Sequence, residues 1–122
     1  LDLERLEQFL KILPKHPRSA FEFRDESWQC EEVWSLLSKY GVAYCVMDSP
    51  GLPLHLRTTC GYSYIRMHSG GDEGNYTDDH LREWAGYATD MMGKGDVYIY
   101  FNNDYKGFAV KNALKLRDML QS

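Results

Sequence analysis

The chain has 122 residues, 43% of them hydrophobic and 14% aromatic, and a formal net charge of -4. These values are typical of a folded domain and exclude a disordered tail. An acidic chain offers no overall basic surface to nucleic acid or anionic membranes, and no apolar run approaches the roughly 20 residues that a membrane span needs. The three cysteines lack CxxC spacing and are interpreted as reduced packing residues. We therefore expect a cytoplasmic protein that does not enter a membrane.

Helix and strand patterns alternate from one end of the chain to the other. Leucines at helical spacing behind Asp2 predict a first helix. Two further helices are predicted behind the caps Ser27 and Thr77, and a last one covers residues 110–120. Strands are predicted at residues 20–24, 42–48, 62–68 and 96–101. The prolines and glycines within residues 49–61 predict an irregular connection in place of a helix.

This alternation indicates parallel strands joined by right-handed crossovers. A complete barrel of this type needs about 250 residues. We therefore predict an α/β fold with parallel β/α units forming about half of a TIM-type (β/α)8 barrel, with residues 1–122 as a single partial domain. The chain begins at Leu1 and has no lead-in strand, so we expect that an N-terminal half is missing. Either that half of the same protein or a second copy, in a homodimer, would cover the two open sheet edges.

Side-chain alternation decides which residues face the barrel interior. Apolar members of two strands must pack beneath helices, and they are Phe21, Phe23, Ile65 and Met67. The residues that alternate with them then point inward, and they are Glu22, Arg24, Arg66 and His68. Asp48 and Asn102, at the ends of two other strands, are expected to join them. These carboxyl ends are where barrel enzymes keep their sites.

The residue types at these positions indicate separate roles. Arg24 and Arg66 present planar forks of donors suited to phosphate or carboxylate. The candidate catalytic residues, which would act as acid or base, are Glu22, His68 and Asp48. Further candidate ligand-binding residues are Asn102, Asn103 and Trp28, the last of which would stack on a ring unless it packs against its own helix.

We consider three functions. The first is an enzyme or enzyme-derived barrel that binds an anionic small molecule, with no cofactor indicated by the sequence. The second is a metal-assisted nuclease in which Glu22, Asp48 and His68 hold a divalent ion, although the acidic composition does not favour nucleic acid. The third is a non-catalytic module in which the charged residues form a structural lattice of ion pairs.

Four phrases resemble the YecE-like family, a domain of unknown function. They are residues 21–24 (FEFR), 27–28 (SW), 64–68 (YIRMH) and 100–104 (YFNND). Their order and spacing match the family across nearly the whole chain. The resemblance implies the second half of a barrel of the triosephosphate isomerase type, with a site but no defined reaction. Met67 and Ser69 depart from the usual aromatic and glycine of the family's RxH element. Similarity of this barrel to sugar isomerases and to an endonuclease that cuts at abasic sites is an analogy of fold alone.

Overall fold

The computed structural model describes residues 1–14, 17–49, 51, 53–68, 74–103 and 107–121. Its helices are α1 (Leu3–Ile12), α2 (Glu31–Lys39), α3 (Asp78–Met92) and α4 (Phe108–Gln121), together with a short 3-10 helix, η1 (Glu26–Trp28). Its strands are β1 (Ala20–Phe21), β2 (Ala43–Asp48), β3 (Tyr62–Met67) and β4 (Asp96–Phe101). Helices and strands therefore follow one another in the predicted order.

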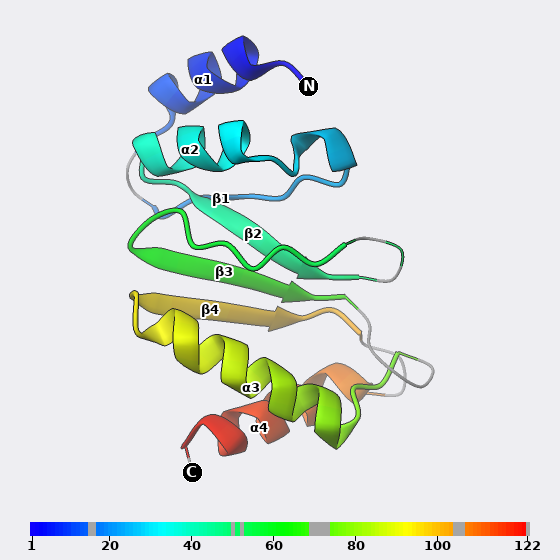
Figure 1. The fold of residues 1–122 in the computed structure, drawn as a ribbon. Coiled ribbons are helices and arrows are strands. Elements are labelled where there is room, and N and C mark those ends of the chain that lie inside the picture. The colour runs from blue at the N-terminus through cyan, green and yellow to red at the C-terminus, as the bar shows by residue number, and fades with distance from the viewer. Residues whose placement is uncertain (15–16, 50, 52, 69–73, 104–106, 122) are drawn as a thin grey trace.

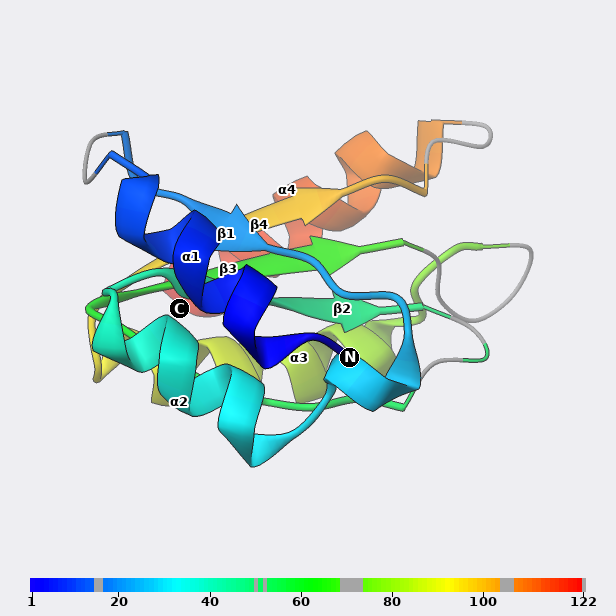
Figure 2. The ribbon, with the colours of Figure 1, turned by 90° about the horizontal axis from the view of Figure 1, so that it is seen from above.

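The strands form one parallel sheet in the order β1-β2-β3-β4. The arrowheads of β2, β3 and β4 point the same way in Figure 1, and β1 runs parallel to β2, so all four strands run toward the same end of the molecule. Figure 2 shows α2 and α3 together on one side of β2 and β3. Strands that are neighbours both in sequence and in the sheet are the arrangement of a (β/α)8 barrel wall. The predicted α/β class with parallel β/α units is confirmed.

The face of the sheet beneath the helices holds the hydrophobic core. Val46, Ile65 and Met67 are fully buried and belong to one cluster with Leu81 and Trp84 of α3. Removing side chains of this size from water contributes about 1.5–3 kcal/mol each. The prediction that Ile65 and Met67 lie beneath helices is confirmed. None of the described helices is both long and apolar enough to cross a membrane.

Two of the three predicted helix caps are confirmed. The Asp2 carboxylate accepts a hydrogen bond from the Arg5 backbone N–H at 3.1 Å, and the Thr77 hydroxyl accepts one from the His80 N–H at 3.2 Å. The prediction that Ser27 caps a helix is wrong. Its N–H donates to the Asp25 carboxylate at 2.9 Å, which places Ser27 inside η1, and α2 begins only at Glu31. Aspartate competes well with serine for such a cap.

Strand β1 is shorter than predicted. Its ladder with β2 contains only Ala20 and Phe21, so residues 22–24 lie beyond the regular pairing. The side-chain amide of Gln29 donates to the Phe23 carbonyl at 2.5 Å, where a ladder bond was expected. Phe21 nevertheless contacts Phe9 of α1, with ring centroids 5.6 Å apart, as its predicted place beneath a helix requires.

The crossover from β2 to β3 contains no helix among its described residues, as predicted. It is fixed to the sheet by Thr59. The Thr59 hydroxyl donates to the Val42 carbonyl at 2.7 Å and accepts from the Tyr44 N–H at 3.0 Å. A side chain thus pairs with a backbone N–H of β2 and with the carbonyl of the residue before it.

Candidate functional site

A carboxylate surrounded by two guanidinium groups lies at the carboxyl end of the sheet. Glu22 Oε1 accepts a hydrogen bond from Arg66 Nη1 at 2.5 Å, and Glu22 Oε2 lies 3.4 Å from Arg24 Nε. The exposed fractions of the side chains are 22% for Glu22, 30% for Arg66 and 63% for Arg24. Residues from the segment after β1 and from β3 therefore meet across β2, as their predicted inward orientation requires.

His68 and Asn102 complete this group, which we call the Glu22 cluster: Glu22, Arg24, Arg66, His68 and Asn102. The His68 ring nitrogen Nε2 lies 3.5 Å from Glu22 Oε1, and Asn102 Oδ1 accepts from Arg66 Nε at 3.1 Å. His68 is held in place through its backbone N–H, which donates to the Asp48 carbonyl at 2.9 Å. The structure thus brings together five of the eight residues that the sequence singles out.

The electrostatics of the cluster favour an ionised Glu22. Partial burial raises the pKa of its carboxyl group, but the charge of Arg66 and the hydrogen bonds from His68 and Arg66 oppose this more strongly, and the pKa is lowered. One carboxylate and two guanidinium groups carry a net positive charge even when His68 is neutral. A second anion near this cluster would therefore be attracted rather than repelled.

We call the face of the sheet that carries Arg66, opposite to the helix-covered face, the inner face. Tyrosines line this face next to the Glu22 cluster. Tyr100 is the β4 partner of Arg66 in the ladder, and its ring stacks on that of Tyr64 with centroids 5.1 Å apart and planes 20° apart. Cys45, the β2 partner of Tyr64 in the ladder, is buried, and burial raises the pKa of its thiol to about 12. The alternation of β4 predicts that Tyr100 faces inward, but no feature of the sequence marks it as a functional residue.

Asp48 does not join the cluster, and the prediction that it faces the interior is wrong. It is the ladder partner of Met67, whereas Met47 is the partner of Arg66, so its side chain lies on the helix-covered face. There its Oδ2 is 3.5 Å from Nε2 of His80, in the first turn of α3. The reason is that residues 42–48 are apolar on both faces, and such a run gives no alternation from which to assign a side.

The profile of a family described as "Protein of unknown function DUF72" matches residues 1–122. The chain belongs to this family. The predicted YecE-like membership is thereby confirmed. The comparison with curated proteins gives no match.

Crystal structures of DUF72 family proteins share the fold of this DUF72 chain. One from Thermotoga maritima superposes with a TM-score of 0.88 at 29% sequence identity, covering 98% of this chain and 52% of that one. One from Enterococcus faecalis, at 19% identity, shows likeness of fold alone, with a TM-score of 0.81 and the same coverage of 98% and 52%. The DUF72 chain spans about half the length of these structures. Its β/α units form about half of a TIM-type barrel, as predicted.

Asn103 and Trp28 lie apart from the Glu22 cluster. Asn103 is buried, and its amide donates to the Gly74 carbonyl at 2.8 Å and to Asn112 Oδ1 at 2.7 Å. It therefore ties the end of β4 to the segment before α3 and to α4. Trp28 stacks on Phe23 with centroids 5.3 Å apart and planes 6° apart, at the margin of the core. Within the described residues, no contact joins either side chain to the Glu22 cluster.

The structure does not assemble the metal site that the nuclease hypothesis requires. Glu22 and His68 lie on the inner face while Asp48 lies on the other, as the ladder register shows. Among the described parts of the DUF72 chain, no three side chains of His, Cys, Asp or Glu are close enough together to hold a metal ion. The donors that do converge, two guanidinium groups and an imidazole, suit an anion rather than a cation.

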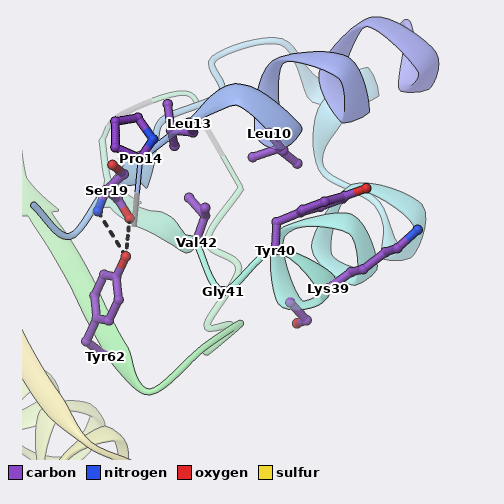
Figure 3. A pocket seen from close by; sticks show the side chains of 10 residues that line it. Leu10, Leu13, Pro14, Ser19, Lys39, Tyr40, Gly41, Val42 and Tyr62 are labelled. Atoms are coloured by element: carbon purple, nitrogen blue, oxygen red, sulfur yellow. Dashed lines mark hydrogen bonds between the residues drawn. The ribbon is translucent and has the colours of Figure 1, made fainter. Parts of the chain in front are cut away.

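A cavity of about 470 Å³ lies at the opposite end of the sheet (Figure 3). Its walls come from the ends of α1 and α2 and from the first residues of β3. The Tyr62 hydroxyl that faces it donates to the Ser19 carbonyl at 2.7 Å and accepts from the Ser19 N–H at 2.9 Å, and the Lys39 amine is bound to Glu7 at 2.8 Å. None of the predicted site residues lines this cavity. Because these polar groups are paired and no charged cluster from the described part of the chain lines the cavity, we place the candidate site at the carboxyl ends.

Proposed function

We propose that this DUF72 chain binds a small molecule bearing a phosphate or carboxylate group at the Glu22 cluster. The observation that carries the proposal is the meeting of Arg24, Arg66 and His68 around the single carboxylate of Glu22. The side chains of Glu22, Arg66 and His68 are only 22%, 30% and 18% exposed, so each gives up part of its hydration, a cost that apolar side chains in the same space would avoid. These charged side chains lie at the carboxyl ends of parallel strands, where barrel enzymes have their sites, so we expect them to bind a ligand.

The two arginines differ in how firmly they are held, and this difference supports a binding role. Arg66 engages Nη1 and Nε with Glu22 and Asn102, but a guanidinium group has five N–H donors. Arg24 is mostly exposed and lies 3.4 Å from Glu22, which is a loose contact. In the proposal Arg66 is the preorganised part of the clamp, and Arg24 turns from Glu22 onto the ligand.

Glu22 and His68 provide the acid–base pair of the proposal. In the proposal, the neutral His68 carries its proton on Nε2, which lies 3.5 Å from Glu22 Oε1, and its other ring nitrogen, Nδ1, accepts a proton from the ligand. Protonated His68 would add a further positive charge beside the bound anion. Both protonation states of His68 are compatible with anion binding, but only the neutral state can act as a general base.

The test is a calorimetric titration of this chain with inorganic phosphate, a sugar phosphate and a dicarboxylate. Arg66→Ala should weaken the binding of each anion by about 10–100-fold, because charge-assisted hydrogen bonds are lost. Arg66→Lys retains the charge but not the fork and should give an intermediate loss. Arg82→Ala is the matched control, since Arg82 pairs with Asp79 on the surface of α3.

Equal affinity of the wild type and Arg66→Ala for every anion would contradict the proposal. The Glu22 cluster would then be a structural lattice of ion pairs. In that case substitutions at Glu22 and His68 should change thermal stability without changing the binding of any anion.

A further inference from the structure

An aromatic surface lies beside the arginine of the proposed clamp. Tyr100 pairs with Arg66 in the ladder between β3 and β4, so the two side chains leave the same face of the sheet from positions about 5 Å apart. The Tyr100 side chain is 50% exposed. Asn102, two residues further along, leaves the same face and bonds to Arg66. One strand therefore brings an aromatic ring and an amide to the same guanidinium group.

The Tyr100 ring is held in a fixed orientation before any ligand arrives. It stacks on Tyr64 with centroids 5.1 Å apart and a small angle of 20° between the planes. One face of the Tyr100 ring is thus supported by Tyr64, and the residue is half exposed. An aromatic ring that is already oriented loses little conformational entropy when it contacts a ligand.

Tyr98 lies two residues before Tyr100, on the same face of β4, and has different contacts. Its hydroxyl accepts a hydrogen bond from Arg18 at 2.9 Å, and Arg18 also binds Asp96 at 2.8 Å. This network lies toward the amino end of β4, away from the Glu22 cluster. Tyr98 therefore belongs to a polar structural network. Tyr100 is the ring that lies level with Arg66.

We propose that the anionic ligand of the Glu22 cluster carries a ring and that this ring stacks on Tyr100 while its phosphate or carboxylate group binds Arg66 and Arg24. The inference rests on the proposed function and narrows the class of ligand. The spacing of adjacent strands fits a ring that is attached directly, or through one or two bonds, to the anionic group. Both an aromatic ring and a sugar ring present a flat face of this kind, so the experiment includes one of each.

The experiment compares the affinity of the chain for inorganic phosphate, phenyl phosphate and glucose 6-phosphate. If the ring contributes, at least one of the two ring compounds should bind about tenfold more tightly than inorganic phosphate. Tyr100→Leu, which keeps an apolar side chain but removes the ring, should abolish that advantage. Its affinity for inorganic phosphate should stay within about twofold of the wild type.

Two control variants locate the effect. Tyr100→Phe keeps the ring and should keep the advantage, and Tyr98→Leu removes the ring two residues earlier on the same strand and should also keep it. If phosphate binds but neither ring compound binds more tightly, or if Tyr98→Leu and Tyr100→Leu act alike, the ring inference is wrong while the anion site stands. If no phosphate compound binds, then both the proposed function and this inference are wrong.

Discussion

Two carboxylates lie at the carboxyl ends of the strands, on opposite faces of the same sheet. Glu22, on the inner face, is bound by Arg66 and lies near Arg24 and His68. Asp48 lies on the helix-covered face, where its Oδ2 atom is 3.5 Å from Nε2 of His80 and is buried without a regular hydrogen bond among the described residues. The two side chains are almost equally exposed, at 22% and 21%, so the carboxylates differ in their neighbours: guanidinium groups surround the first, and a histidine ring lies beside the second.

Two tyrosines, one on each face of the sheet, differ in the same way. Tyr76 is 2% exposed, packs edge-on against Phe101 with centroids 5.6 Å apart, and has its pKa raised by burial and by the charge of Asp48. Tyr100 is half exposed and touches Tyr64. The presence of a carboxylate and a tyrosine is therefore not enough to identify a site in this chain. The face of the sheet decides which neighbours a carboxylate has and how far a tyrosine is buried.

The largest expected effect is a difference in stability between these two tyrosines. Tyr76→Ala should lower the free energy of unfolding by about 3–5 kcal/mol, because it leaves a cavity in the core. Tyr100→Ala should lower it by only about 1 kcal/mol, because it removes a half-exposed ring and one stacking contact. Urea denaturation of the two variants measures both values.

A second variant keeps this comparison testable if Tyr76→Ala does not fold. Tyr76→Phe retains the ring and removes a hydroxyl group that makes no regular hydrogen bond among the described residues. It should change the free energy of unfolding by less than about 1 kcal/mol. Equal losses in Tyr76→Ala and Tyr100→Ala would show that the inner face is packed as firmly as the core.

The sequence predicts the fold and most of the inner face because alternation is unambiguous where one face is apolar and the other polar. In β3, Ile65 and Met67 fix the side on which Arg66 must lie, and the structure agrees. The failures have physical causes. A strand that is apolar on both faces carries no such signal, so Asp48 was assigned to the wrong side. The contacts of His80 and Asn103 depend on tertiary packing across long separations in sequence, which periodicity does not encode.

The second prediction concerns the charge of each carboxylate. Glu22→Gln should raise the affinity for inorganic phosphate by about tenfold, because it frees Arg66 and Arg24 from a competing negative charge. Asp48→Asn removes the same charge from the other face and should leave the affinity within about twofold of the wild type. Calorimetric titration at fixed ionic strength measures both. An equal gain in the two variants would indicate a response to net charge alone and would remove the distinction between the faces.

The smallest expected effect is the pH dependence that Glu22 gives to stability. Its folded-state pKa is lowered below the ordinary value of 4.5. A lowered pKa means that the folded state binds the proton less tightly than the unfolded state, so the stabilisation is present above the ordinary value and is lost as the pH falls through the folded value. Because solvent reaches the cluster, the contribution should stay below about 1 kcal/mol. Unfolding of the wild type and of Glu22→Gln at pH values of about 6 and about 3 isolates it, and the wild type should lose more stability than the variant. Equal losses would mean that Arg66 does not favour the ionised form of Glu22, and the electrostatic basis of the anion site would fail with it.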